Sequence, residues 1–239
     1  DFSLLVSTGS ISFVKKLTVD YRNRWQQLTG CILHEFSFGM TETHTCDTFT
    51  AGLQQDNFDL SFAPTFVGLP VCGTEFKVCD FSSKQLVPLG QEGELWIKSP
   101  SLLKGYWNNP TNDILTDGWL PTGDIGLITD AGYIRYLGRR KEMLKVNGMS
   151  VFPSELEAML GQHPHIAGSA VLGKNDPSCG QQVIAFVQLK QQGSQTADDL
   201  IEWCKNYMAV YKVPKIILIN QLPMTATGKV KKMDLEKLI

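Results

Sequence analysis

The sequence has no hydrophobic run that approaches the roughly 18–20 residues that a membrane-spanning helix requires. It also has no excess of charge of one sign, because 22 Lys and Arg face 24 Asp and Glu, for a formal net charge of −2 and a pI of about 6.1. Domains that bind nucleic acid are usually basic. We therefore expect neither a transmembrane segment nor nucleic acid as a partner, and peripheral membrane contact stays open.

The cysteines do not form the spacing patterns that are typical of a metal site or of a disulfide framework. The six cysteines, at 31, 46, 72, 79, 179 and 204, form no CxxC pair, and the chain has only four histidines. This spacing argues against both a zinc site and a disulfide scaffold. Free thiols are typical of the reducing cytosol, so we expect a cytoplasmic protein.

The start of the chain lacks an initiator methionine and a signal peptide. Residues 2–6 are apolar and residues 7–10 read Ser-Thr-Gly-Ser, which is typical of a buried strand that runs into a turn. A domain rarely begins inside its own core strand. We therefore expect a piece of a longer protein, and leave open whether it arose by design, by proteolysis or by natural truncation.

Residues 1–60 are predicted to form a parallel α/β unit. Leu4–Val6 and Cys31–Leu33 are strand candidates, and apolar residues recur at nearly helical spacing over Ile11–Leu28 between them. A strand, a helix and a second strand in this order favour parallel pairing.

Residues 64–137 change to short strands separated by turns that contain Gly and Pro. The predicted strands are Glu75–Asp80, Gly93–Ile97, Gly126–Thr129 and Tyr133–Leu137. Short strands joined by tight turns predict a small antiparallel sheet or barrel.

The rest of the chain is predicted to form a separate α+β domain of about 100 residues. Helices are expected over Pro153–Leu160, Thr196–Met208 and Met233–Ile239, and strands over Ile166–Leu172, Val183–Leu189 and Ile216–Ile219. Pro near the first turn and early acidic residues suit helix N-termini. The predicted fold class is thus α/β and α+β, with domains at 1–140 and 141–239.

A first stretch that could carry chemistry runs from Phe38 to Thr43, after a strand. Its aromatic ring could stack on a base, and Gly39 allows close backbone approach. Thr41 could donate to a phosphate, and Glu42 could hold Mg²⁺. A capped turn at the end of a strand explains the same residues equally well.

Two further stretches offer charged groups. Asp124, in Thr122-Gly123-Asp124, follows a tight glycine turn, and its carboxylate could accept hydrogen bonds from both hydroxyls of a ribose. Arg139 could return to the same nucleotide across a hairpin. Lys229, in Thr225–Lys229, could place a mobile positive charge on a developing phosphate charge. Taken alone, a solvated Asp turn and a surface Lys are the simpler explanations.

In their order and spacing, these stretches resemble the adenylate-forming superfamily, which includes AMP-dependent acyl-CoA synthetases, firefly luciferase and peptide-synthetase adenylation domains. The matching segments are Phe38–Glu42 (aromatic-Gly-x-Thr-Glu), Gly93–Ile97 with Gly105-Tyr106 (GELxI…GY), Thr122–Asp124 (TGD), Gly138–Gly148 (hinge) and Thr225–Lys229 (terminal lysine). The resemblance covers essentially the whole chain. It implies the C-terminal part of a large adenylation domain, with an α/β piece and a small barrel-like sheet, followed by a small mobile α+β lid domain.

The resemblance implies a two-step ligase reaction. A carboxylic acid and MgATP give an acyl-adenylate and pyrophosphate, and the thiol of coenzyme A then displaces AMP. By resemblance, Phe38 stacks on adenine, Thr41 contacts phosphate and Glu42 ligates Mg²⁺. Asp124 would hold the ribose, Arg139 would assist at the ribose or phosphate, and Lys229 would stabilise the transition state of adenylation. Gly9, Ser10, Gly39 and Tyr136 are expected to line the nucleotide site.

The hinge segment carries a second set of implied roles. In the family the small domain rotates between the two half-reactions, and Lys141 falls at the pivot position. Lys145 and Gly148 resemble residues of the thiolation face, where Gly148 would leave room for a pantetheine arm.

Some parts that the resemblance implies lie upstream of residue 1. They are the Ser/Thr/Gly-rich loop that grips the β- and γ-phosphates of ATP and one half of the acyl pocket. We therefore expect the isolated chain to be inactive and to expose apolar surface that the missing N-terminal half would cover.

The sequence of residues 138–153 is most similar to the corresponding segment of fatty or medium-to-long-chain acid–CoA ligases. A fatty acyl-AMP ligase, or another adenylating enzyme that loads a carrier protein, is one alternative. A non-catalytic nucleotide-binding or interaction fragment is an alternative of a different class. A Ser/Thr/Gly/Lys loop upstream would favour the enzyme, and a start codon at residue 1 would favour the binding module.

Overall fold

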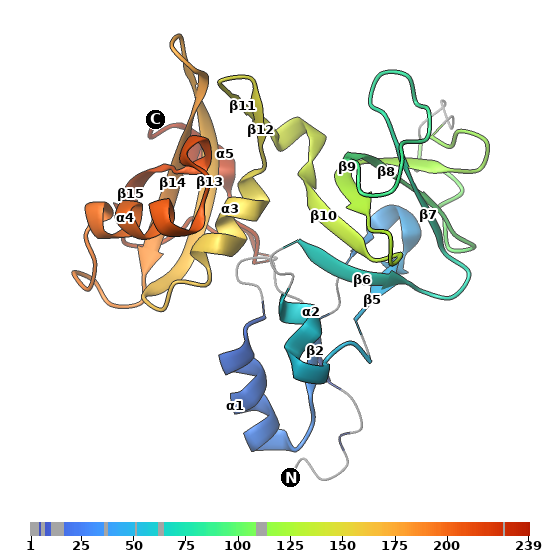
Figure 1. Ribbon diagram of the computed structural model, residues 1–239, viewed down its shortest axis with the longest axis horizontal. Coiled ribbons are helices and arrows are strands. Elements are labelled where there is room, and N and C mark those ends of the chain that lie inside the picture. The colour runs from blue at the N-terminus through green and yellow to red at the C-terminus, as the bar shows by residue number, and fades with distance from the viewer. Residues whose placement is uncertain are drawn as a thin grey trace. The chain divides into compact units, whose positions relative to one another are not determined.

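The computed structural model describes residues 5, 8–10, 17–35, 38–50, 52–61, 65–108, 114–226 and 228–239 (Figure 1). These residues divide into two compact units. Unit 1 contains residues 8–10 and 17–141, and unit 2 contains residues 142–239. No helix within the described ranges is both long and apolar enough to span a membrane.

Unit 1 opens with a parallel pair of the predicted kind, but its first strand lies at residues 8–10, where the sequence predicted a turn, and Leu5 of the predicted strand is exposed and outside any strand. Strand β1 (Thr8–Ser10) pairs in parallel with β2 (Leu33–Glu35), and α1 (Val19–Thr29) lies between them in the chain. Helix α1 begins after Thr18, whose hydroxyl accepts a hydrogen bond from Tyr21 N, and it ends at Gly30 in the left-handed conformation. The strand expected at 31–33 therefore lies two residues further on. Leu4, Val6 and the first residues of the predicted helix (11–16) lie outside the described residues.

The periodicity of α1 predicted its existence but not the face that it buries. The buried residues are Arg22 and Thr29, whereas Tyr21 and Leu28 remain 44% and 65% exposed. Arg22 forms a two-pronged ion pair with the buried Asp59 of α2 (Phe58–Ser61), with N–O distances of 2.8 and 2.5 Å. A buried charged pair thus links α1 to α2, and Trp25 is the half-buried member of the apolar stripe, with its indole N–H donating to the Thr8 hydroxyl at 2.9 Å.

The main sheet of unit 1 is antiparallel and six-stranded, in the order β5-β6-β10-β9-β8-β7. Its strands are β5 (Thr48–Phe49), β6 (Phe66–Pro70), β7 (Glu75–Cys79), β8 (Gly93–Lys98), β9 (Leu120–Ile128) and β10 (Ile134–Arg139). Leu95, Ile97 and Ile134 are fully buried at its centre. The predicted small antiparallel sheet is therefore confirmed, with β9 beginning six residues earlier than the pattern indicated.

Unit 2 is an α+β domain built on a five-stranded sheet. The chain runs through β11 (Leu144–Val146), β12 (Met149–Val151), α3 (Pro153–Leu160), β13 (Ile166–Asp176), β14 (Gly180–Leu189), α4 (Ala197–Tyr207), β15 (Lys215–Ile219) and α5 (Lys232–Glu236). Strand β14 pairs antiparallel with β13 and β11 and parallel with β15. Helix α3 has the predicted bounds, and the predicted second helix is α4 together with its two caps, Thr196 and Met208.

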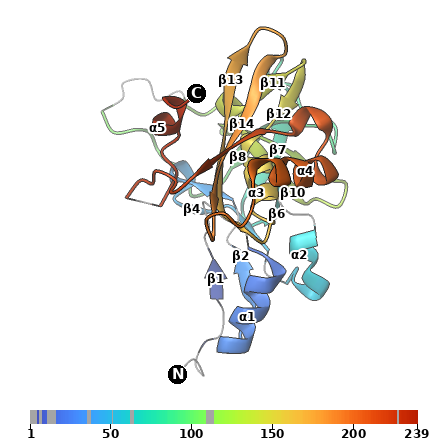
Figure 2. The same ribbon diagram turned by 90° about the vertical axis from the view of Figure 1, so that its left-hand side faces the viewer.

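Strands β13 and β14 are buried on both faces, because their alternate residues enter two different cores. Val171 and Val187 belong to the core covered by α3 and α4. Leu172 and Phe186 belong to the core covered by α5. Figure 2 shows α5 on one side of these strands and α3 and α4 on the other.

Candidate functional site

The turn that carries Thr41 and Glu42 is held to a distant loop of unit 1. Thr41–Thr43 form a single 3-10 turn, η1, between the short strands β3 (Gly39–Met40) and β4 (Thr45–Cys46). Glu42 Oε1 accepts a hydrogen bond from the Tyr106 hydroxyl at 2.7 Å, and this bond raises the pKa of Tyr106. The Glu42 carbonyl accepts a second hydrogen bond, from Leu103 N, also at 2.7 Å. Two motifs that are far apart in the sequence therefore meet at Glu42.

A buried carboxylate supports the same turn. Asp47 and Thr43 are both fully buried, and the Thr43 hydroxyl lies 2.6 Å from Asp47 Oδ2. Burial raises the pKa of Asp47, and the hydrogen bond from Thr43 partly opposes this rise. Sequence reasoning missed Asp47, because a single Asp after a turn has no distinguishing spacing.

Phe38 is a core residue of unit 1. It is 7% exposed, and its ring centroid lies 5.7 Å from that of Tyr136 and 6.0 Å from that of Phe76. The structure thus brings together two of the predicted nucleotide-site residues, Phe38 and Tyr136. Gly9 and Ser10 lie apart from them in the sheet order, on β1 of the two-stranded sheet.

The Thr122-Gly123-Asp124 motif is a bulge inside β9, and the predicted tight turn before a strand is wrong. Glu94 of β8 pairs with Ile125, whereas Trp96 pairs with Pro121, so residues 122–124 together oppose Leu95. Gly123 has a φ of 72°, which favours glycine. Thr122 donates to the Leu95 carbonyl and accepts from Asp124 N. Bulges of this kind redirect a side chain out of the regular strand alternation.

The hairpin of β9 and β10 brings Arg139 to Asp124, as predicted. The two residues are direct partners in the ladder, and Arg139 Nε lies 3.2 Å from Asp124 Oδ1. The Asp124 side chain is only 4% exposed, whereas that of Arg139 is 46% exposed. The carboxylate therefore lies under a solvent-facing guanidinium, an arrangement in which the carboxylate can accept hydrogen bonds from a polar ligand and the guanidinium can donate them.

Lys229 lies in a tight hairpin of unit 2. The Met224–Val230 bridge closes it, Thr225 N donates to the Lys229 carbonyl at 2.7 Å, and Lys229 N donates to the Thr225 hydroxyl at 3.0 Å. Gly228 has a φ of 77° within the turn. The lysine side chain is exposed. The predicted glycine turn before this lysine is therefore present.

The segment predicted to be a hinge includes the end of unit 1. Lys141 is the middle residue of the 3-10 turn η3 (Arg140–Glu142), and unit 2 begins at the next residue. Lys145 is on β11 and its Nζ donates to the Ser150 hydroxyl at 2.9 Å. Asn147 and Gly148 both have positive φ between β11 and β12, as in a two-residue type I′ hairpin.

Glu42 offers a single carboxylate to a metal ion. No group of three or more His, Cys, Asp or Glu that could hold a metal ion occurs in the described part of the chain. Mg²⁺ in nucleotide enzymes is commonly held by one or two carboxylates together with substrate phosphates. One partly exposed carboxylate suits a metal ion that arrives with a nucleotide, and does not suit an all-protein cage.

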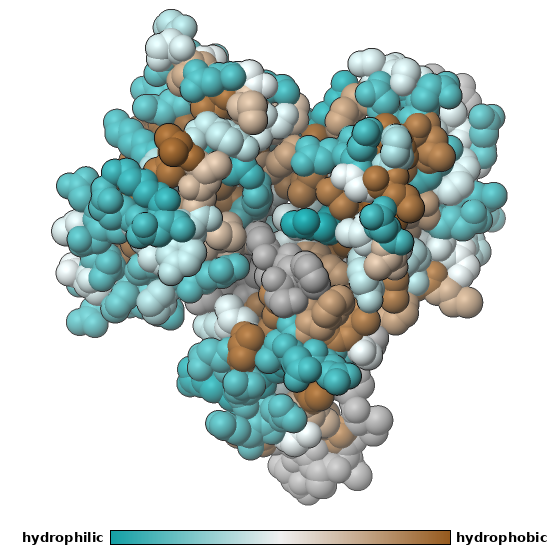
Figure 3. All heavy atoms as spheres, in the orientation of Figure 1, coloured by the Kyte–Doolittle hydropathy of each residue, from teal (hydrophilic) through white to brown (hydrophobic). Residues whose placement is uncertain are grey.

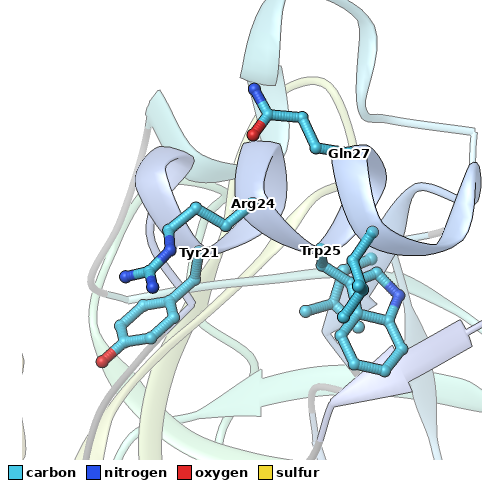
Figure 4. A pocket seen from close by; sticks show the side chains of 6 residues that line it. Tyr21, Arg24, Trp25 and Gln27 are labelled. Carbon is cyan, nitrogen blue, oxygen red and sulfur yellow. The ribbon is translucent and has the colours of Figure 1, made fainter.

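An open apolar groove runs along α1. It has a volume of about 600 Å³ and is lined by Tyr21, Arg24, Trp25, Gln27, Leu28 and Leu33 (Figure 4). Hydrophobic residues also reach the surface elsewhere (Figure 3). The expectation of exposed apolar surface is met at α1, on the face that carries its apolar stripe.

Two family models match the chain: the AMP-binding enzyme model over residues 7–107 and the AMP-binding enzyme C-terminal domain model over residues 155–229. The chain belongs to the AMP-binding enzyme family. The long-chain-fatty-acid–CoA ligase of Yersinia pestis is 36% identical over 239 residues, which cover 98% of this chain and 40% of that protein. This AMP-binding enzyme chain thus spans about 40% of the length of the curated relatives that it matches.

Solved structures give the same assignment. The anthranilate CoA ligase AuaEII in complex with anthranoyl-AMP superposes with a TM-score of 0.81 at 31% identity, over 100% of this chain and 45% of that one. ATP-bound MatB from Rhodopseudomonas palustris gives 0.78 at 29% identity, over 97% and 45%. The chain therefore has the fold of the C-terminal part of adenylate-forming enzymes.

The family matches include some of the site residues and leave others between them. The first match contains Phe38, Thr41 and Glu42, and the second ends at Lys229. Asp124 and Arg139 fall between the two matches. Their assignment to a site therefore depends on the local motifs and on the observed ion pair.

Proposed function

We propose that the chain is the C-terminal part of an AMP-forming acid–CoA ligase. The enzyme would activate a carboxylic acid, with fatty acids as the first class to test, to an acyl-adenylate and transfer the acyl group to coenzyme A. The observation that carries the proposal is the Asp124–Arg139 pair, formed by two motifs of the family across one hairpin. The alignment with a long-chain-fatty-acid–CoA ligase over 98% of the chain supports the choice of acid.

In the first half-reaction the acid's carboxylate oxygen attacks the α-phosphorus of ATP, and pyrophosphate leaves. Asp124 would accept hydrogen bonds from the ribose hydroxyls, and Arg139 would donate to the ribose or to a phosphate oxygen. Thr41 would donate its hydroxyl to a phosphate. Phe38, whose ring is mostly buried, would meet adenine through the part that stays accessible, next to Tyr136.

Glu42 is the residue that would ligate Mg²⁺. The metal ion would offset the negative charge of the phosphates. Tyr106 occupies one oxygen of this carboxylate and so limits its rotation. This hydrogen bond is compatible with one-point metal binding through the second oxygen.

Lys229 would stabilise the charge that develops on the phosphate during adenylation, because an exposed ammonium on a hairpin is a mobile point charge. In the second half-reaction the thiol of coenzyme A attacks the acyl carbon and AMP leaves. Lys145 and Gly148 would face the pantetheine arm in this step, and Lys141 would be the pivot between the two arrangements.

The chain alone would lack the loop that grips the β- and γ-phosphates. The 40% coverage of the curated relatives supports this view, and so does the uncovered apolar groove of α1, which an N-terminal half would bury. We propose a cytoplasmic location, which suits the free thiols of the six cysteines.

The test is mass spectrometry of the full-length protein incubated with MgATP, coenzyme A and a panel of carboxylic acids. We expect acyl-CoA from the wild type, and a loss of adenylation of about 100-fold or more in Lys229→Ala, the size of effect that follows loss of one electrostatic stabiliser. Acyl-AMP without acyl-CoA would indicate an enzyme that loads a carrier protein. Neither product from any acid would favour a non-catalytic nucleotide-binding or interaction protein.

A further inference from the structure

Lys232 lies where three charged side chains from separate parts of unit 2 meet. Its Nζ is 2.9 Å from Glu157 Oε1 on α3 and 3.6 Å from Glu142 Oε2 at the end of η3. The side chains of Lys232 and Glu157 are 27% and 23% exposed. The Lys232–Glu157 pair is therefore more sheltered than most surface pairs and solvent screens it less, whereas Glu142 is 41% exposed.

Glu157 is fixed from a second direction. Its Oε1 also accepts a hydrogen bond from Val171 N, on β13, at 2.8 Å. Burial raises the pKa of Glu157, and the positive charge of Lys232 opposes this rise. Lys232 is therefore the counter-charge of a carboxylate that is already tied to the sheet.

Lys232 also ends the hairpin that carries Lys229. The Met224–Val230 bridge closes this hairpin, Lys231 N donates to the Pro223 carbonyl at 2.8 Å, and α5 starts at Lys232. Three residues beyond Lys232, Leu235 is 2% exposed in the core under α5. The leg of the hairpin that leads away from Lys229 thus contacts the protein body at three points: Val230 packs against the core under α5, Lys232 forms its ion pairs, and Leu235 is buried in the same core.

We propose that Lys232 is a positioning residue for Lys229, because its ion pairs with Glu157 and Glu142 fix the base of the Lys229 hairpin to α3 and to the first residue of unit 2. The inference rests on the proposed function for the role of Lys229 in adenylation. It adds that the Lys232–Glu142 ion pair connects the hairpin to the residue that follows the proposed pivot, Lys141.

The anchoring can be measured without catalysis, by hydrogen exchange of the Thr225 and Lys229 amides in this chain. We expect about fivefold faster exchange in Lys232→Met, the size of effect that follows loss of one sheltered ion pair. Lys237→Met is the matched control, since Lys237 lies at the other end of α5, is 73% exposed and forms a local ion pair with Asp234 three residues earlier. Unchanged exchange in Lys232→Met would overturn the proposal.

The positioning role is tested by separating the half-reactions of the full-length enzyme. We expect adenylation to fall about tenfold in Lys232→Met, while thioester formation from supplied acyl-AMP stays at the wild-type rate. Lys232→Arg should restore adenylation, because it keeps the charge. Equal losses in both half-reactions, together with a lower melting temperature, would mean a general structural role and would overturn the proposal.

Two further variants keep the result interpretable. Glu142→Gln removes only the longer and more exposed ion pair of Lys232. It should speed amide exchange and slow adenylation by less than Lys232→Met does, and it remains informative if Lys232→Met folds poorly. No change in either rate would contradict the link between Lys232 and Glu142. If Lys229→Ala adenylates at the wild-type rate, the proposed role of Lys229 fails. The exchange comparison still decides in that case whether Lys232 anchors the hairpin.

Discussion

The η1 turn depends on single residues, and replacing Thr43 tests most directly how the buried Asp47 carboxylate is stabilised. Its hydroxyl donates a hydrogen bond to Oδ2 of the buried Asp47 carboxylate at 2.6 Å. The sequence identified Thr41 and Glu42, because they match a motif. It did not identify Thr43 or Asp47, whose importance comes from complete burial, a property of the folded sheet.

We expect Thr43→Val to lower the free energy of unfolding by about 1–3 kcal/mol at neutral pH, because it leaves a buried carboxylate oxygen unpaired. Burial raises the folded pKa of Asp47 above its ordinary value of 3.8. This carboxyl group therefore stabilises the fold most below pH 3.8, and that contribution is lost as the pH rises through the folded pKa. Loss of the Thr43 hydrogen bond raises the folded pKa further, so the deficit should grow as the pH rises above the ordinary pKa of 3.8.

Urea unfolding at several pH values measures this dependence. Thr29→Val is the control, because Thr29 is also buried and its hydroxyl donates to the Trp25 carbonyl within α1. Its cost should not vary with pH. A Thr43→Val deficit that is equally independent of pH would show that Asp47 is not the group affected.

At the scale of elements, the β9–β10 hairpin carries the Asp124–Arg139 pair, and two of its four glycines, Gly126 and Gly132, serve different purposes. Gly126 lies in β9, where an added Cβ would come within 2.4 Å of the Arg135 carbonyl. Gly132 lies in the turn with a φ of 81°, and an added Cβ would meet nothing within 4 Å. The first glycine is needed for space and the second for its backbone conformation.

We expect Gly126→Ala to destabilise unit 1 by about 3 kcal/mol and Gly132→Ala by about 1 kcal/mol, measured by urea unfolding. Replacement by Asn separates the two causes, since Asn tolerates the left-handed conformation. Gly132→Asn should cost less than Gly132→Ala, whereas Gly126→Asn should cost at least as much as Gly126→Ala. The opposite order at either position would contradict this assignment.

Elements with strong local signals were predicted well. The bounds of α3 are as predicted, and α4 is framed by Thr196, whose hydroxyl accepts from Asp199 N in a capping box. The start of β9 was missed because Pro121 and Gly123 look like a turn, and only pairing with β8 makes them part of a strand.

At the scale of the whole molecule, the chain divides into two units between Lys141 and Glu142, and the proposed two-step mechanism would use this division. We expect Lys141→Pro to slow thioester formation more than adenylation, because proline restricts φ at 141 and the conformation of Arg140 before it. Lys141→Ala is the control, since it removes the side chain and keeps the backbone freedom. The measurement is the rate of each half-reaction; equal losses in both steps would count against a pivot at this residue.

The sequence by itself determined the order of most of the longer helices and strands, the antiparallel sheet of unit 1, the α+β character of unit 2 and the motifs that carry Asp124, Arg139 and Lys229. It did not indicate α2, β6 or the short strands β3, β4, β5, β11 and β12. These features depend on local periodicity, turn residues and short-range spacing, which the chain carries wherever it lies. The tertiary structure alone decided that the apolar stripe of α1 faces outward, that Glu42 meets Tyr106, that Asp47 is buried under Thr43 and that Lys232 joins Glu142 to Glu157. Burial and long-range pairing belong to no single segment, because each requires residues far apart in the chain to share one location.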